Sequence, residues 1–224
     1  MSAETPSTAS STSSRSPSPS ASDDPSLSPD EALVAPDGPP RSRFAFAVTG
    51  SGHYLEESMA LAARLPAVDL FLSAAAEEVL AQYGFTLDAL RKRHKLFRDK
   101  SASSVPVGML YSDVYHTVIV APATSNTVAK CAFGISDTLP TNMFAQAGKL
   151  GIPGIVFACD TEPTVITKAP HEWVTLHPRR IELDNVERLR GIDHCRVVCS
   201  PAELEAALSR RLRELSLEWN TSSS

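Results

Sequence analysis

The stretch TVIVAPATSNTVAKCAFGISDTLPTN, residues 117–142, contains the transition that decides the fold. Its apolar run, residues 118–121, is typical of a fully buried strand, and Pro122 ends this strand in a loop of small hydroxyl and amide residues. Apolar residues then recur at helical spacing, and Ser125 or Asn126 is the expected N-cap. A buried strand that runs through a polar loop into a helix N-terminus leaves N–H groups and hydroxyls at one crevice, which suits an anionic or polar cofactor.

The same stretch predicts a second helix directly after the first. Gly134 is the expected end of the first helix, and the second is expected to begin behind Asp137. Pro140 then falls in the first turn of the second helix, where a missing N–H group costs nothing.

Further apolar runs of strand length alternate with helical patterns along the chain. The expected strands are residues 44–48, 68–72, 154–158, 173–176 and 196–199, and the expected helices are residues 55–65, 74–83, 86–92, 184–189 and 201–215. This alternation favours a parallel sheet covered by helices on both faces. The predicted fold class is therefore α/β, a three-layer, Rossmann-like (flavodoxin-like) sheet, with ligands beyond the carboxyl ends of its strands.

A glycine-containing loop follows the first expected strand. Gly50, Ser51, Gly52 and His53 stand between that strand and the next helix. Glycine lets a ligand approach the backbone closely, and a helix N-terminus attracts phosphate. A G-S-G sequence also forms ordinary tight turns, but its place after the first strand favours a phosphate-binding role.

Two segments of the central stretch, PATSNTVAK at residues 122–130 and GISDTLPTN at residues 134–142, resemble the signature of the homo-oligomeric flavin-containing flavoproteins, the HFCD superfamily. This superfamily includes phosphopantothenoylcysteine decarboxylases, archaeoflavoproteins and dihydromethanopterin reductases. With GSGH at residues 50–53 and LDNVERL at residues 183–189, the chain resembles the dihydromethanopterin reductases (acceptor) and archaeoflavoproteins most. The resemblance covers about residues 43–215.

The resemblance implies that the cofactor is FMN. In the related flavoproteins the small-residue loop, here residues 123–127, embraces the isoalloxazine ring, and a serine at the position of Ser73 touches the phosphate. Ser73 also has the position of a helix N-cap, which by itself explains a serine there. The predicted cofactor-binding residues are Gly50, Ser51, Gly52, His53, Ser73, Pro122, Ala123, Thr124, Ser125, Asn126 and Thr127. No catalytic residue and no metal ligand is predicted.

The resemblance also implies a homo-oligomer. Members of the superfamily assemble as trimers that often build larger shells, and residues 137–142 lie where its members approach the flavin of a neighbouring subunit. From the sequence alone, this helix start can equally be internal to one subunit.

The site departs from the decarboxylases of the superfamily in two places. Gly108 stands where they have a histidine, and residues 159–170, CDTEPTVITKAP, lack their Pro-x-Met-Asn substrate clamp. The loss of a general base and an anion clamp argues against oxidative decarboxylation. The expected activity is FMN-dependent reduction of dihydromethanopterin, or a related dihydropterin, with NAD(P)H or another electron donor. An FMN electron-transfer protein without a small substrate, and a phosphopantothenoylcysteine-decarboxylase-like flavoprotein, are the alternatives.

Several charged side chains are candidates for a role beside the flavin. Lys130, one helical turn after Asn126, and Asp160 and Glu162 are candidates to place charge near the ring. The structural alternatives are that Lys130 forms a surface ion pair, that Asp160 only shapes a turn, and that Glu162 is a solvated loop charge. Among the histidines, His53 is the better functional candidate, whereas His116 at the start of the central strand is expected to be packed.

Composition divides the 224 residues into three parts. Residues 1–42 are rich in serine and proline and poor in large apolar residues, which predicts a disordered extension; residues 43–217 form the FMN-binding domain, and residues 218–224 a flexible C-terminus. No secretory pattern and no apolar run of ~20 residues is found, so a cytoplasmic protein without membrane contact is expected.

Charge and cysteine usage exclude other classes. The formal net charge is −5, and no basic stripe with aromatic residues predicts nucleic-acid binding. The basic cluster at residues 91–95 is interpreted as a solvated helix end. Alternatively, the cluster lies at the rim of the site and attracts a phosphorylated or polyanionic substrate. Four scattered cysteines, Cys131, Cys159, Cys195 and Cys199, predict reduced thiols without the iron–sulfur segment of related archaeal reductases.

Overall fold

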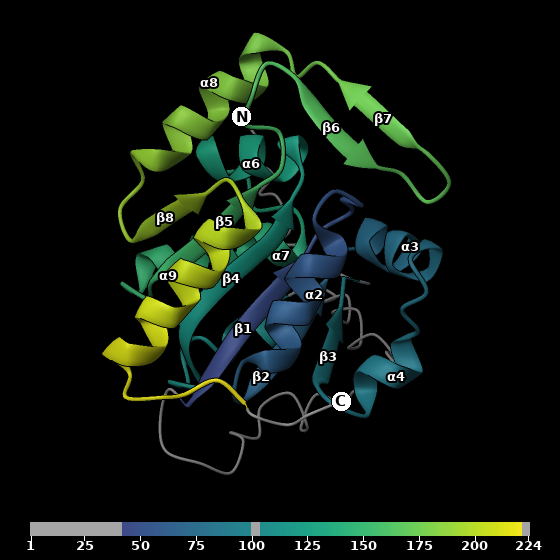
Figure 1. The fold of residues 1–224 in the computed structure, drawn as a ribbon. Coiled ribbons are helices and arrows are strands. Elements are labelled where there is room, and N and C mark those ends of the chain that lie inside the picture. Colours follow the sequence, from purple (N-terminus) through teal and green to yellow (C-terminus); the bar gives the residue numbers. More distant parts are fainter. Residues whose placement is uncertain (1–41, 100–103, 221–224) are drawn as a thin grey trace, which may run out of the picture.

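The computed structural model describes residues 42–99 and 104–220, and its main element is a six-stranded sheet in which every neighbouring pair is parallel. The strand order is β3-β2-β1-β4-β5-β8 (Figure 1). The strands are β1 (Arg43–Val48), β2 (Val68–Leu72), β3 (Lys95–Arg98), β4 (Tyr115–Ala123), β5 (Gly154–Ala158) and β8 (Cys195–Val198). Their carboxyl ends lie along the upper edge of the sheet in Figure 1.

Helices cover both faces of the sheet, as the alternating pattern predicts. On one face, α2 (Leu55–Arg64), α3 (Ala74–Gln82), α4 (Leu87–Arg91) and α9 (Pro201–Glu214) pack in a core with Phe44, Phe46 and Val48 of β1. On the other, α5 (Ser104–Gly108), α6 (Ser125–Ala132), α7 (Leu139–Lys149) and α8 (Arg180–Arg190) pack in a core with Ala45 and Ala47. The predicted three-layer α/β fold is therefore confirmed.

The edge strand β3 is an element that the sequence did not predict. The cluster at residues 91–95 begins at a helix end as predicted, since α4 ends at Arg91 with Lys92 as its C-cap, but Lys95 already belongs to β3. Leu96 and Phe97 are buried, and the ring of Phe97 stacks on that of Phe71 with 4.7 Å between centroids. Two apolar residues between basic ones give too short a signal, and the strand depends on packing against β2.

Three predicted helix starts are wrong by one or more residues. The N-cap of α6 is Thr124, not Ser125 or Asn126, and the N-cap of α7 is Thr138, not Asp137. Helix α8 begins at Arg180, so residues 184–185 lie inside it instead of capping it. Its N-cap, Arg179, is not a typical capping residue; the Glu182 carboxylate accepts a bond from the Arg179 backbone N–H instead.

Residues 173–176 form a strand as predicted, but outside the parallel sheet. This strand, β7 (Trp173–Leu176), pairs antiparallel with β6 (Val165–Lys168), and the hairpin lies beyond the carboxyl ends of the main strands (Figure 1). The hairpin thus lies over the edge where the fold is expected to bind ligands.

The chain makes defined contacts beyond the predicted domain boundary at residue 217. Asn220 donates its backbone N–H to the Arg64 carbonyl at 2.7 Å, and the Arg64 guanidinium lies 4.5 Å from the Trp219 ring centroid. The predicted disorder of residues 1–42 falls almost wholly outside the described residues. None of the helices in residues 42–99 and 104–220 is long and apolar enough to cross a membrane.

Candidate functional site

A cavity of ≈ 290 Å³ lies at the carboxyl edge of the sheet, and the β6–β7 hairpin contributes to its lining. The loop at residues 50–53 forms one wall, and Thr124 and Asp160 contribute from the ends of β4 and β5. The remaining wall comes from α3, through Val79, Gln82 and Tyr83, and from the hairpin side, through residues 167–170 and Leu176. The loops after β1, β4 and β5 therefore meet at one cavity, as the sequence predicted for a parallel sheet.

Two glycines of the loop at residues 50–53 occupy positions where a side chain does not fit. A Cβ added to Gly50 would lie 2.5 Å from the Ala75 Cβ, and one added to Gly52 would lie 2.2 Å from the Tyr83 Oη. The loop is thus pressed against the first turn of α3, which brings the N-termini of α2 and α3 together. Such close packing distinguishes this loop from an ordinary surface turn.

Side-chain caps leave part of each helix N-terminus open. Ser73 Oγ accepts the N–H of Ala76 at 3.0 Å, and Thr124 Oγ1 accepts the N–H of Thr127 at 3.2 Å. Other first-turn N–H groups, such as those of Ala75 and Ser125, have no acceptor within residues 42–99 and 104–220. Helix α2 has no side-chain cap at all. The cavity edge is therefore rich in backbone donors and in the positive ends of helix dipoles.

Thr49 joins the two loops that the sequence singled out. Its Oγ1 donates to the Pro122 carbonyl at 2.7 Å and accepts the N–H of Thr124 at 3.1 Å. This buried hydroxyl fixes the end of β1 to the loop after β4. Sequence reasoning missed Thr49, although a hydroxyl residue at a strand end before a glycine turn was the available signal.

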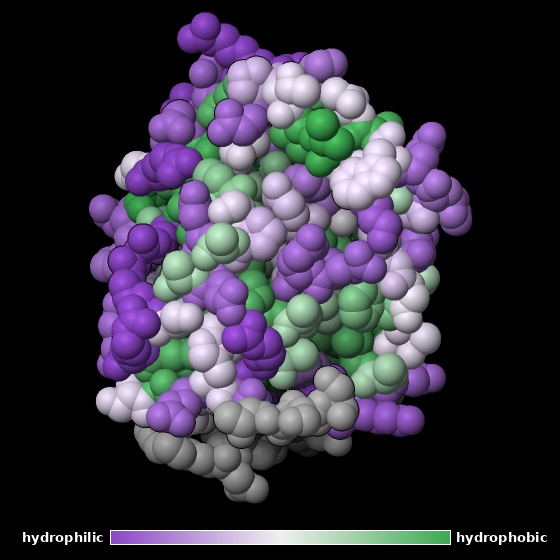
Figure 2. Space-filling model, viewed as in Figure 1, coloured by the Kyte–Doolittle hydropathy of each residue, from purple (hydrophilic) through white to green (hydrophobic). Residues whose placement is uncertain are grey.

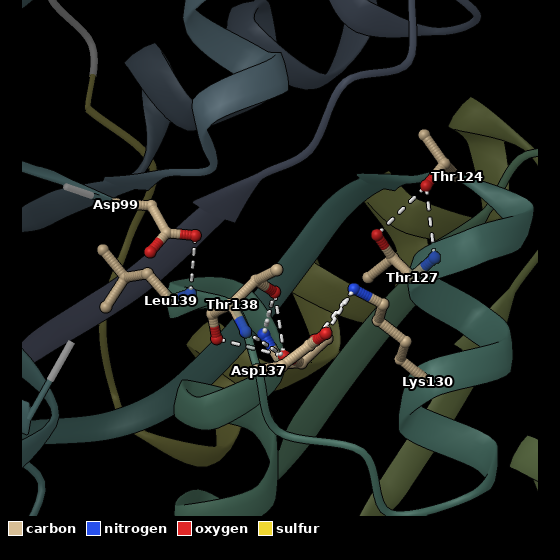
Figure 3. A network of polar contacts seen from close by, with 8 residues as sticks. Asp99, Thr124, Thr127, Lys130, Asp137, Thr138 and Leu139 are labelled. Carbon is tan, nitrogen blue, oxygen red and sulfur yellow. Dashed lines mark hydrogen bonds and ion pairs between the residues drawn. The ribbon is translucent and has the colours of Figure 1, made fainter. Parts of the chain in front are cut away.

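Of the predicted charged candidates, only Asp160 lines the cavity. Its carboxylate accepts a hydrogen bond from Ser125 Oγ in the first turn of α6, where the helix dipole favours a negative charge. Glu162 is exposed in the loop after β5. Lys130 forms an ion pair with Asp137 at 2.8 Å across the α6–α7 connection, so the surface-pair alternative is correct (Figure 3).

The start of α7 is held by a polar network that the sequence did not reveal. Asp99, which follows β3, accepts the N–H of Leu139 at 2.9 Å (Figure 3). Thr138 and Thr141 form a reciprocal capping box. This network fixes α7 beside α6 on one side of the sheet. The N-terminus of α7 is therefore partly satisfied within the chain.

Burial keeps the histidine and cysteine nearest the cavity uncharged at neutral pH. Burial lowers the pKa of His53, whose Nε2 is buried without a hydrogen-bond partner. Burial raises the pKa of the Cys159 thiol to about 12, and Ser51 Oγ lies 3.3 Å from its sulfur. His116 is packed edge-on against Phe44 near the amino end of β4, which confirms its predicted packing role, and burial with the nearby Arg211 lowers its pKa to about 4.

The eleven predicted site residues do not all reach the cavity. Residues 50–53 and Thr124 line it, whereas Ser125 approaches through Asp160. Pro122 and Ala123 are buried at the end of β4, and Ser73 caps α3. The Thr127 hydroxyl is hydrogen-bonded to the Thr124 hydroxyl at 3.0 Å. Asn126 is exposed and does not line the cavity. The sequence missed Tyr83 and Lys168, because no local motif marks a helix end and a short hairpin that meet only in the fold.

Comparison with known proteins identifies the family of this chain. A flavoprotein family profile matches residues 37–212, and the chain belongs to the flavoprotein family. The predicted membership of the flavin-containing superfamily is thus confirmed.

Individual relatives agree with this assignment. A crystal structure of Burkholderia xenovorans DmrB, described as a complex with FMN and as a cubic protein cage for redox transfer, is 69% identical, with a TM-score of 0.75, and the match covers 80% of this chain and 99% of that one. Dihydromethanopterin reductase (acceptor) of Methanosarcina mazei is 34% identical over 72% of this chain. The protein of that name from Methanocaldococcus jannaschii is 34% identical over 58% of this chain. The chain spans 66% and 58% of the lengths of these two reductases.

Proposed function

We propose that this protein is an FMN-dependent oxidoreductase that reduces dihydromethanopterin, or a related dihydropterin, to its tetrahydro form. The observation that carries the proposal is the glycine turn at residues 50–53, pressed against the first turn of α3 at the edge of the cavity. The names of the two archaeal reductases support the pterin substrate, and the FMN complex of DmrB supports the cofactor.

The residues present fit a flavin mononucleotide. The backbone N–H groups around Gly52 and Ala75, with the N-termini of α2 and α3 behind them, would hold the phosphate. Thr124 and Asp160, at the other side of the same cavity, would hold polar atoms nearer the ring. When bound, the flavin supplies hydride or electron transfer between a reduced donor, such as NAD(P)H, and the substrate.

The chain's own residues would orient and enclose the reactants. The β6–β7 hairpin forms part of the cavity wall, and Tyr83 Oη donates to the Lys168 carbonyl at 2.7 Å, which holds the hairpin against the end of α3. At the position where the decarboxylases have a histidine, Gly108 lies in α5 and offers no side chain to accept a proton. This arrangement favours a reductase over a decarboxylase.

We also propose a trimer-based homo-oligomer in the cytoplasm. The cage described for DmrB supports assembly. Large apolar side chains, among them Phe133 (56% exposed) and Trp173 (70% exposed), remain uncovered on the single chain, and Figure 2 shows hydrophobic surface in the upper right, where the hairpin lies. Exposed apolar patches of this kind are typical of contact surfaces.

Anaerobic stopped-flow spectroscopy tests the proposed reaction. We expect NAD(P)H or a chemical reductant to bleach the flavin absorbance, and a dihydropterin to restore it at a rate no slower than turnover. Dihydrofolate and single-electron acceptors are the comparison substrates. Reoxidation by a protein or quinone acceptor, with no response to any dihydropterin, would replace the reductase with the electron-transfer alternative.

A further inference from the structure

The cavity that would receive the FMN phosphate and a smaller cavity beside it contain, taken together, more negative than positive side chains. Asp160 lines the main cavity, and Glu56 and Glu57 line a smaller adjoining cavity of ≈ 140 Å³ beside the α2 N-terminus. The two cavities share Gly52, His53, Tyr83, Thr167 and Lys168. A phosphate monoester carries a charge of about −1.5 to −2 at pH 7, so these carboxylates oppose its binding unless a cation is close.

Lys168, in β6, is the lysine that lines both cavities. It is the only lysine or arginine among the described residues that line either cavity. Its backbone is held in place because the Tyr83 hydroxyl donates to its carbonyl at 2.7 Å, and the same hydroxyl fills the space that a side chain at Gly52 would need. The hairpin thus places Lys168 in the walls of the same two cavities that Gly52 lines.

The ammonium group of Lys168 has only a weak partner in the flavin-free chain. Lys168 Nζ lies 3.7 Å from Glu56 Oε2, and both side chains are 56% exposed. An exposed pair at this distance contributes little to stability, because solvent screens it and two flexible side chains must be ordered. A phosphate at the α2 N-terminus would therefore draw Lys168 away from Glu56 at little cost.

His53 and Lys130, the two other basic side chains that the sequence offered as candidates beside the flavin, fit this role less well. His53 lines both cavities, but its Nε2 is buried without a hydrogen-bond partner and burial lowers its pKa, which disfavours the charged imidazolium. Lys130 is bound to Asp137 and lines neither cavity.

We propose that Lys168 is the counter-charge of the FMN phosphate, and that it exchanges Glu56 for the phosphate when the cofactor binds. This inference rests on the proposed binding of FMN and adds a residue outside the flavin signature. It also links the cofactor to the hairpin, because the residue that pairs with the phosphate belongs to β6. A strong charge-assisted bond forms only with a ligand that carries the phosphate.

Riboflavin, which has the same ring and ribityl chain without the phosphate, provides the ligand control. Dissociation constants of FMN and riboflavin are measured by flavin fluorescence quenching on the flavin-depleted full chain, for wild type, Lys168→Met and Lys149→Met. Lys149, at the C-terminal end of α7, lines neither cavity and is the matched control. We expect Lys168→Met to weaken FMN about tenfold or more and to leave riboflavin unchanged, since a hydrogen bond to a charged group is lost.

A second variant tests the exchange of partners. Glu56→Gln removes the competing carboxylate, so FMN should bind more tightly and riboflavin as before. Two results with Lys168→Met would overturn the inference. An equal loss of affinity for FMN and riboflavin would show that Lys168 only supports the hairpin. Unchanged affinity for both flavins would show that Lys168 does not belong to the site. Wild type that binds neither flavin would instead contradict the proposed function.

Discussion

A Gly50→Ala variant is expected to fold but to lose most of its affinity for FMN. The added Cβ would lie 2.5 Å from the Ala75 Cβ and 3.3 Å from the Ala75 carbonyl carbon. Because Ala75 belongs to the first turn of α3, the glycine turn must move away from that helix, and the two sets of backbone donors no longer converge. Overpacking of this kind costs about 1–3 kcal/mol, and a cost of this size that falls on the FMN-binding conformation lowers the affinity roughly fivefold to 150-fold.

Gly148→Ala is the matched control for this prediction. A Cβ at Gly148, in α7, would meet no atom within 4 Å. We expect this variant to bind FMN like wild type, in the same titration and with the same far-ultraviolet circular dichroism. Wild-type affinity in Gly50→Ala would show that the glycine turn does not touch the cofactor.

An Asp69→Ala variant is expected to be the most destabilised single substitution in the sheet. Asp69 is fully buried in β2; its carboxylate accepts a bond from Tyr115 Oη at 2.8 Å and bonds from the Arg43 guanidinium, one of them at 2.9 Å. Its loss leaves the Tyr115 hydroxyl and the Arg43 charge without their partner, and breaking a buried ion pair in this way costs about 3–5 kcal/mol. Urea denaturation with a constant m-value measures the effect.

Asp88→Ala provides the comparison, because Asp88 pairs with Arg91 at the surface of α4. We expect its free energy of unfolding to stay within about 0.5 kcal/mol of wild type. A loss below about 1 kcal/mol in Asp69→Ala would contradict the assigned role of the buried cluster, since that is the size of one ordinary hydrogen bond.

The sequence predicted the fold well where burial and local pattern agree. The runs at β1, β2, β4 and β5 are wholly or almost wholly buried, so their apolar composition was a direct signal of strand. At the helix start after β4, however, Thr124, Ser125 and Asn126 are all capable caps. The fold selects Thr124, because Thr49, directly after β1, accepts its backbone N–H, and no local rule contains that contact.

The lining of the candidate cavity was predictable only in the parts that have a sequence motif. The GSGH loop and Thr124 line the cavity, whereas Asn126, which belongs to the same signature, is exposed and does not line it. Tyr83 and Lys168 are far apart in the chain and meet through a helix end and a hairpin that pairs outside the main sheet. The role of Asp69 was not predictable for a different reason. A single carboxylate within VDLFL does not indicate that its hydrogen-bond partners lie on β1 and β4.

The flavin content of the purified full-length chain tests the central claim most directly. After purification in the presence of FMN and removal of the excess, the protein is denatured, and the released flavin is identified by chromatography and quantified against protein. We predict yellow protein that releases FMN, not FAD or riboflavin, in an amount close to stoichiometric with the chain, because the cavity combines phosphate-binding helix N-termini with polar side chains. Folded protein that is colourless and does not take up added FMN would contradict the account.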